Sequence, residues 1–409
     1  MAEDKLAPIS ITERIEIVDV LRGLAIGGIF VGNMQWFSGY GFMPDAIAAQ
    51  SPFADQAARF LVHVFIEGKF YSIFSFLFGF GFALQISRAA DRGDTQATVF
   101  KRRLFWLLII GVIHAFLLWS GDILSVYALM GFVLLLFRKK ATESLPKWIF
   151  GLIIAPIAVY VIFLVLFLVF APPDVAASVA DAKNGMWQNA VSVVPNGTYL
   201  RIMVDYNLNI LAGRWAGLIF EMRLPKILAM FLLGFYAYRR GIFQSLGENK
   251  ALISRVLVYG LPVGIVLNLI FAYYAGRESV LPPEPIGLLG VVTYGFGVPA
   301  LALGIIALTV TAWQCNWGQK ILSIFVPVGR MAMTNYLLQT VVAITIFYGF
   351  GFGLYGTTGA AKATAIALTV FVFQIILCTV WLKFFQYGPM EWIWRQLTYR
   401  KRLPLLRSS

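Results

Sequence analysis

The sequence contains only two histidines, and each has a carboxylate at a spacing that suits proton transfer. His114 lies near the end of an apolar run, and Gly121 predicts a tight turn that folds Asp122 back toward the imidazole. A carboxylate beside an imidazole orients the ring and favours the imidazolium, as a general base requires. The alternative is that Asp122 only caps the helix that follows it.

The second pair is His63 and Glu67, which are four residues apart and share one face of a predicted helix. They also suit acid–base chemistry, with Lys69 close by in the sequence. The alternative is a buried structural pair in which Glu67 also bonds Lys69 or another helix.

A third pair lies in the first apolar segment, where Asp19 and Arg22 are three residues apart. Arg22 is expected to bind an anion such as a phosphate, with Asp19 holding its guanidinium in place; the alternative is a simple interfacial ion pair. Asn33, further along the same helix, is either a polar stabiliser of a site or the donor of an interhelical hydrogen bond.

The elements that must position these residues are membrane helices. The chain has 409 residues, of which 59% are hydrophobic and only 13% charged, and its mean hydropathy is +0.78. This composition excludes a soluble enzyme, a disordered chain and a disulfide scaffold. The apolar residues come in long runs rather than in alternation, which excludes an outer-membrane barrel. We expect an all-α, polytopic integral membrane bundle.

Ten apolar runs predict ten transmembrane helices with both termini cytoplasmic. The predicted spans are Ile17–Trp36, Ala57–Ile86, Leu104–Trp119, Ile123–Phe137, Trp148–Phe170, Leu224–Tyr238, Ile253–Tyr273, Ile286–Trp313, Met331–Phe350 and Ala363–Phe384. In this topology Asp19 and Arg22 lie at the inner side, whereas the other polar groups lie in the outer part of the membrane. We therefore expect a cavity open to the outside among Asn33, His63, His114 and Asp122.

The net charge of +13 is explained by basic loops that orient the helices, so no nucleic acid partner is expected. These loops follow the second, fourth and sixth spans, and the tail is basic as well. The charged first sixteen residues favour a retained first helix over a secretory signal. The bacterial cytoplasmic (inner) membrane is the expected location, with lipids as partners.

Three regions divide the chain: an N-terminal five-helix half (1–170), an outer segment (171–223) and a C-terminal five-helix half with a basic tail (224–409). Ala171–Leu200 is predicted to be an outside loop, since it is proline-containing and too polar to span. Arg201–Arg223 is expected to lie in the interface as an amphipathic helix, or else to form a partial span. Tyr387–Thr398, rich in tryptophan, predicts another interfacial helix.

No metal site is expected, because two distant cysteines and two histidines make no ligand cluster. The run from Gly329 to Thr340 brings Thr334, Asn335 and Gln339 into an apolar helix, where they are expected to hold helices together. Arg330, at the start of this helix, could instead meet a lipid head group.

Several of these stretches resemble the bacterial YeiB-like membrane protein family. The matching stretches are Asp19–Gly23, Glu67–Gly79, Gly111–Leu129, Gly329–Gln339 and Gly388–Trp392, in order along nearly the whole chain.

More widely, the chain is similar to transmembrane acyltransferases such as heparan-α-glucosaminide N-acetyltransferase, which share the Asp19-x-x-Arg22-Gly23 opening. That resemblance implies transfer of an acyl group from cytoplasmic acyl-CoA, the expected co-substrate, to an acceptor such as a sugar across the membrane. Asn33 is similar to an asparagine at the end of their first helix. Their catalytic histidine follows in the first outer loop, but Phe37–Gln56 here has none, so His114 would have to serve.

The resemblance and the residues together favour membrane acyl transfer. His114 is then the general base, Asp122 its orienting group and Asn33 a polar stabiliser, with His63 and Glu67 as further acid–base candidates. Arg22, Asp19 and Lys69 are assigned to the acyl donor, and the acceptor is expected to be a small molecule, a sugar or a lipid. The alternatives are a transporter or lipid or solute carrier that uses the same polar cavity, and a non-catalytic membrane or lipid-binding protein. The sequence does not separate a monomer from a homodimer, but the glycine and phenylalanine surface of the second helix would suit a homodimer.

Overall fold

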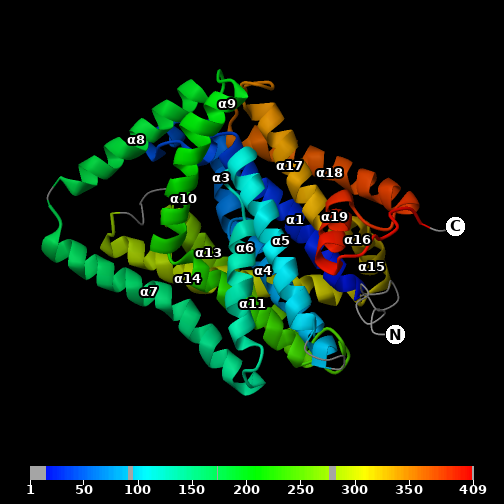
Figure 1. Cartoon of the computed structure of the whole chain (residues 1–409). Coiled ribbons are helices and arrows are strands. Elements are labelled where there is room, and N and C mark those ends of the chain that lie inside the picture. Colours follow the sequence, from blue (N-terminus) through cyan, green and yellow to red (C-terminus); the bar gives the residue numbers. More distant parts are fainter. Residues whose placement is uncertain (1–14, 91–94, 173, 276–281, 408–409) are drawn as a thin grey trace.

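The computed structural model describes residues 15–90, 95–172, 174–275 and 282–407, and within them the molecule is a bundle of helices without a β-strand (Figure 1). The predicted all-α class is confirmed. Six helical runs are long and apolar enough to cross a membrane, and a bent pair over residues 316–347 makes a seventh. The chain is therefore a multi-pass membrane protein.

Every predicted span coincides with a helix. In chain order these helices are α1 (Glu16–Phe37), α3 (Phe53–Phe65) with α4 (Lys69–Ala90), α5 (Thr95–Leu117), α6 (Leu124–Leu134), α7 (Leu145–Phe170), α11 (Arg223–Arg239), α12 (Lys250–Arg255) with η7 (Val256–Gly260) and α13 (Leu261–Ala275), α14 (Pro285–Trp313), α17 (Ala332–Phe347) and α18 (Ala360–Phe384). Three of them are not counted as spans by length and composition: α5 carries Lys101, Arg102 and Arg103, whereas α6 has only 11 residues and α11 only 17. Ten spans therefore stay a prediction.

The second predicted span is not one continuous helix, which corrects the sequence prediction. Helix α3 ends at Phe65 and α4 begins at Lys69, with Gly68 between them at a φ of +83°. This left-handed conformation suits glycine. A Cβ at Gly68 would also crowd the Tyr294 hydroxyl and the Val298 side chain of α14, so the break is held against α14.

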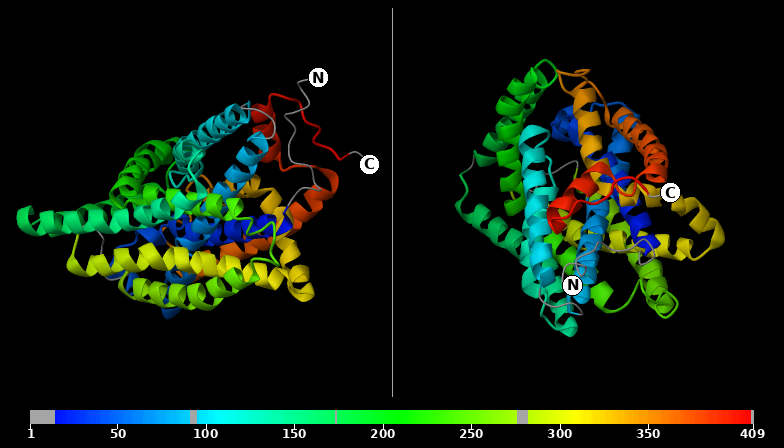
Figure 2. Two further views of the ribbon diagram at one scale, coloured as in Figure 1. Left: turned by 90° about the horizontal axis from the view of Figure 1, so that it is seen from below. Right: turned by 45° about the vertical axis from the view of Figure 1, so that its right-hand side comes forward.

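The predicted outside loop Ala171–Leu200 contains a helix, α8 (Val175–Val193), that was not predicted from the sequence; its location outside the membrane stays a prediction. Trp187, Ala190 and Val193 recur at three-residue spacing and are buried, so this helix has an apolar face that docks on the bundle. Tyr355, in the turn between α17 and α18, is part of the same buried cluster. Figure 1 shows α7 and α8 projecting to the left of the main bundle, and Figure 2 shows α7, α13 and α14 running together when seen from below.

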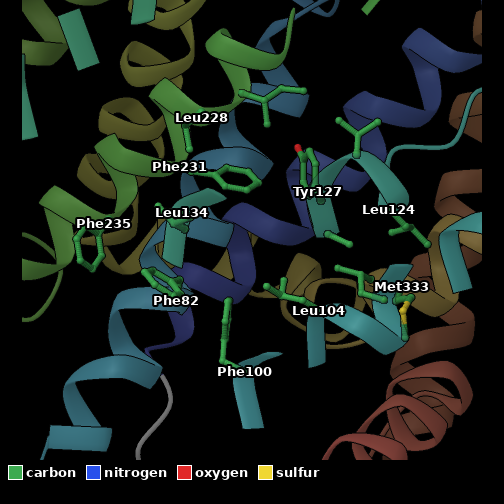
Figure 3. Packing of buried hydrophobic residues seen from close by; sticks show 14 of the residues in the cluster. Phe82, Phe100, Leu104, Leu124, Tyr127, Leu134, Leu228, Phe231, Phe235 and Met333 are labelled. Carbon is green, nitrogen blue, oxygen red and sulfur yellow. The ribbon is translucent and has the colours of Figure 1, made fainter. Parts of the chain in front are cut away.

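Glycines bring α4 and α11 into close contact. A Cβ at Gly79 would overlap the carbonyl oxygen of Phe231, and one at Gly234 would overlap that of Phe76. This glycine face of α4 is therefore used inside the chain and is not free for the predicted dimer contact. Around this crossing a large buried cluster forms, in which Phe82, Tyr127 and Phe231 pack together with residues of both predicted halves (Figure 3). The division into three regions stays a prediction.

Several shorter helices complete the bundle: α2 (Asp45–Ala48), α9 (Tyr199–Arg201), η6 (Ile202–Asn207), α10 (Leu208–Phe220), α15 (Asn316–Leu322), η8 (Ser323–Phe325), α16 (Val326–Arg330) and α19 (Pro389–Tyr399). Residues 199–220 form one helical run that packs on α5 and α11. Its Asn207 is buried. The Asn207 side chain donates a hydrogen bond to the Ala115 carbonyl oxygen and accepts one from the Ser120 amide. Helix α19 lies where an amphipathic helix was expected, and interfacial placement of both segments stays a prediction.

Candidate active site

The turn after α5 brings His114 and Asp122 together. His114 Nδ1 lies 3.0 Å from Asp122 Oδ1, and both side chains are only 1% exposed. The contact arises because Gly121 packs closely on the Trp119 ring, which leaves no room for a side chain where the chain reverses. The structure thus places this pair as the predicted turn required, while its catalytic role stays a prediction.

Asp122 caps α6 in addition to its contact with His114. Its carboxylate accepts hydrogen bonds from the amides of Leu124 at 3.1 Å and Ser125 at 2.7 Å, and from the Ser125 hydroxyl at 2.5 Å. Arg214 of α10 donates to the Asp122 carbonyl oxygen at 2.8 Å. These contacts fix the carboxylate, and the carboxylate in turn fixes the imidazole tautomer with the proton on Nδ1.

Thr340 of α17 forms a hydrogen bond with the other ring nitrogen of His114, Nε2. Its Oγ1 lies 2.9 Å from His114 Nε2 and 3.3 Å from the carbonyl oxygen of Tyr336. With the proton on Nδ1, Nε2 accepts a hydrogen bond from a hydroxyl, which is the contact a general base makes with its substrate. Because the Tyr336 carbonyl offers a second acceptor, the Thr340 hydroxyl can release Nε2 by rotation.

A cavity of about 260 Å³ lies on the other side of Tyr336. Its walls come from α1, α4, α5, α6, α16, α17 and α19 and are mainly apolar, with Ile26, Phe78 and Leu107 among them. Tyr336, Ile123 and Leu124 line it as well, and the Tyr336 and His114 ring centroids are 5.1 Å apart. The cavity therefore reaches the residues that directly follow Asp122 and the ring that contacts His114.

Arginines gather at another part of the cavity wall. Arg22, Arg103, Arg330 and Arg395 line it together with two carboxylates, Asp19 and Glu391, a formal surplus of four minus two, or +2. We call these four arginines the arginine rim. The predicted pair is present, since Arg22 Nη1 donates to Asp19 Oδ1 at 2.8 Å and Arg22 stays 33% exposed. A basic rim on an apolar cavity suits an elongated anion with a thin, less polar arm.

Helix α19 supplies part of this rim and is fixed by aromatic contacts. The Arg103 guanidinium lies 4.2 Å from the centre of the Trp394 ring, and the Trp394 indole donates to the Arg103 carbonyl oxygen at 3.0 Å. Arg395 lies 4.8 Å from the centre of the Tyr387 ring. Stacking on aromatic faces orients a guanidinium while leaving its N–H groups free for a ligand.

Glu391 joins α19 to the start of α17. Its carboxylate accepts hydrogen bonds from the amides of Met333 at 2.7 Å and Thr334 at 3.0 Å, and from the Thr334 hydroxyl at 2.6 Å. It therefore satisfies free amides at the helix N-terminus. Burial raises the pKa of the Glu391 carboxyl above its ordinary value.

The second predicted pair forms a separate cluster. His63 Nδ1 and Glu67 Oε2 are in hydrogen-bond contact, so the predicted pair forms. Glu67 lies in the break between α3 and α4, however, and not on the helix face predicted to carry both residues. Lys69 is fully buried and donates to the His63 carbonyl oxygen at 2.5 Å rather than to Glu67. None of the three lines the cavity, so the structure does not assign Lys69 to the same site as Arg22.

The expected outer cavity among four polar groups stays a prediction. The cavity described above is lined by Asp19 and Arg22 and by none of the four. Asn33 is half-buried on α1 and has no side-chain hydrogen bond to any residue that the structure describes. His63 on α3 lies against α13, where Phe271 packs edge-on against its ring.

The helix-linking role of the polar residues on α17 is observed. Gln339 donates to Gln374 of α18 at 2.8 Å, and Gln374 donates to the Asn335 carbonyl oxygen at 3.2 Å. Within the described part of the chain, no three His, Cys, Asp or Glu side chains come together as metal ligands.

Sequence reasoning missed Thr340 and most of the arginine rim. Arg103 falls in the basic loop expected after the second span, and Arg395 falls in the predicted interfacial helix Tyr387–Thr398. For Arg330 only contact with a lipid head group was considered. The available signal was the placement of each arginine at or near the cytoplasmic end of a predicted helix that also carries aromatic residues.

Comparison with known proteins agrees with the resemblance seen in the sequence. The profile of a family described as "Protein of unknown function (DUF418)" matches residues 237–401. An uncharacterized protein, YxaH, of Bacillus subtilis is 32% identical over 99% of both chains. Uncharacterized proteins of Bacillus acidopullulyticus and of Escherichia coli, the latter named YeiB, are 29% and 26% identical over at least 97% of each chain. The chain therefore belongs to the YeiB-like family of bacterial proteins.

Proposed function

We propose that this protein is an integral membrane acyltransferase that takes its acyl group from acyl-CoA. The observation that carries the proposal is a single cavity lined both by the arginine rim and by Tyr336 and Ile123. Tyr336 contacts the His114 ring, which Asp122 orients. The rim and the imidazole are the two features that an acyl-CoA-dependent transfer requires: a site for phosphates and a base for the acceptor.

The donor is expected to place its phosphates on the arginine rim, where planar guanidinium groups suit bidentate contacts. Its pantetheine arm follows the apolar wall, and its thioester comes to rest beside Tyr336 and Ile123. Asp19 keeps the Arg22 guanidinium in position through their 2.8 Å contact. In this arrangement the phosphates carry the binding energy, and the arm delivers the thioester carbon to the inner end.

His114 is expected to act on the acceptor. Nε2 removes the proton from an acceptor hydroxyl as its oxygen attacks the thioester carbonyl, which gives a tetrahedral oxyanion. Collapse of this intermediate breaks the C–S bond, and the CoA sulfur leaves with the proton from the imidazolium. Asp122 stabilises the imidazolium between these steps, and Thr340 withdraws its hydroxyl from Nε2 to admit the acceptor.

The proposed topology places the arginine rim at the cytoplasmic side and His114 nearer the outer face. It rests on ten spans, two cytoplasmic termini and a location in the bacterial inner membrane. Support comes from Arg138 and Lys139 after α6, and from Arg239 and Arg240 at the end of α11.

Thiol release from acetyl-CoA tests the function. Membranes containing wild-type protein should release free CoA thiol, and His114→Ala should abolish the release at an equal level of folded protein. A carrier that uses the same cavity would instead move an unchanged substrate, which mass spectrometry of reconstituted vesicles would reveal. Equal thiol release by the wild type and His114→Ala would remove His114 from the chemistry.

A further inference from the structure

Three cations that do not line the cavity lie near the starts of α4 and α11. Lys69 is the first residue of α4, while Arg223 and Lys226 lie on the first turn of α11, which packs against α4. Arg223 pairs with Glu221 and is within electrostatic range of Glu67, in the break between α3 and α4. Lys226 Nζ lies 4.7 Å from the centre of the Tyr294 ring, and the Tyr294 hydroxyl is 2.9 Å from that of Tyr71 on α4. We call Lys69, Arg223 and Lys226 the basic cluster.

Most hydrogen-bond donors of the basic cluster are unused. Arg223 donates from Nε to Glu221 at 2.5 Å, but its two terminal nitrogens have no hydrogen bond to a described residue. Lys226 Nζ has neither a hydrogen bond nor an ion pair within the described ranges. Of the three N–H donors of the Lys69 ammonium, one donates to the His63 carbonyl oxygen. Donors held in a protein interior without acceptors are costly, and a bound anion would satisfy them.

The charge balance also favours an anion. The three cations face two carboxylates, Glu67 and Glu221, which leaves a formal surplus of +1, before any charge on His63 is counted. Helices α4 and α11 both begin here, and the positive ends of their dipoles add to the surplus. The carboxylates hold the cations in place without neutralising them.

The surroundings of the cluster are apolar and exposed. Phe65 on α3 is 42% exposed, Ile219 on α10 is 57% exposed and Leu269 on α13 is 41% exposed. The side chains of Arg223 and Glu221 remain 38% and 35% exposed. A charged group on a lipid-facing surface is expensive unless a polar partner accompanies it.

We infer that the basic cluster binds the phosphate headgroup of an anionic membrane phospholipid, whose acyl chains lie on the exposed apolar side chains of α10 and α13. The phosphate accepts hydrogen bonds from the terminal nitrogens of Arg223 and from the ammonium of Lys226. This site is separate from the arginine rim, since the cavity contains none of its residues, and it does not depend on acyl transfer.

Native mass spectrometry of the full chain in detergent, titrated with phosphatidylglycerol, tests the inference. Wild-type protein should retain the lipid, and both Arg223→Gln and Lys226→Met should bind it about 10-fold more weakly, the usual effect of losing a charge-assisted hydrogen bond. The control is Arg201→Gln, which removes a 61% exposed arginine paired with Asp205 at 3.6 Å and should bind like the wild type.

Two further arms define what would overturn the inference. Inorganic phosphate at the same concentration should not displace the lipid, and displacement would show a free-phosphate site instead. Equal lipid binding by the wild type and by both variants, each with an unfolding temperature like that of the wild type, would show that the basic cluster is not the lipid site. Arg223→Lys should retain part of the affinity, which separates loss of charge from loss of fold.

Discussion

Replacement of Asp122 separates the two tasks that the structure gives this residue. Its carboxylate accepts hydrogen bonds from the Leu124 and Ser125 amides and the Ser125 hydroxyl while it contacts His114 Nδ1. In Asp122→Ala the two amides at the start of α6 lose their acceptor in a buried site. At about 1–3 kcal/mol for each orphaned group, the free energy of unfolding should fall by about 2–6 kcal/mol.

Asp122→Asn should have a smaller effect on stability and a larger one on chemistry. Asparagine caps helices nearly as well as aspartate, but its NH₂ group would face one of the groups that donate hydrogen bonds to the Asp122 carboxylate. We therefore expect a loss of about 1–3 kcal/mol. The neutral amide no longer fixes the His114 tautomer or stabilises the imidazolium, so turnover should fall about 10²–10⁴-fold, the range of general-base catalysis.

Unfolding followed by tryptophan fluorescence in detergent and thiol release per folded protein provide the two readouts. The matched control is Asp205→Asn, whose carboxylate is 51% exposed and pairs with Arg201 at 3.6 Å; its stability should change by less than about 0.5 kcal/mol. Wild-type turnover in Asp122→Asn would refute the orienting role, and wild-type stability in Asp122→Ala would refute the capping role.

Three further predictions follow from the packing and charges described above. Arg103→Gln should raise the KM for acyl-CoA about 10-fold with little change in kcat, because it removes a charge-assisted contact to the donor; a lowered kcat with an unchanged KM would contradict this. Gly234→Ala forces a Cβ onto the Phe76 carbonyl and should cost at least about 2 kcal/mol of stability, whereas Gly151→Ala on α7, with nothing within 4 Å, should be neutral or slightly stabilising. Burial raises the pKa of Glu391 above 4.5, so the folded state favours the protonated carboxyl. The free energy of unfolding should therefore decline as the pH rises through the folded pKa. Denaturation from acidic to neutral pH should show this decline in the wild type and a flatter profile in Glu391→Gln.

Much of the helical architecture can be predicted from apolar runs alone, because lipid forces every backbone group into local hydrogen bonds. The break at Gly68 cannot, since a glycine within an apolar run serves equally well for close packing; contact with Tyr294 and Val298 selects the left-handed conformation. Helix α8 was missed because its polar composition hides the buried face of Trp187 and Ala190.

The candidate site also contains residues that the sequence predicts and residues that it does not. The pairing of His114 with Asp122 follows from a local turn of eight residues, and Arg22 with Asp19 from a single helical turn. Thr340 is 226 residues from His114, and the arginine rim draws on four helices, so only the tertiary packing brings these groups together. Local spacing therefore predicts the pairs, whereas the grouping of residues from distant helices depends on the tertiary packing.

Transfer of a labelled acyl group tests the central claim most directly. Membranes containing the wild type or His114→Ala, at equal amounts of folded protein, would be incubated with deuterated acetyl-CoA, and their lipids and glycolipids analysed by mass spectrometry. We predict a membrane component that carries the deuterated acetyl group with the wild type and is absent with His114→Ala. Labelled product in equal amounts from both proteins, or none from the wild type across donors of several acyl-chain lengths, would contradict the account.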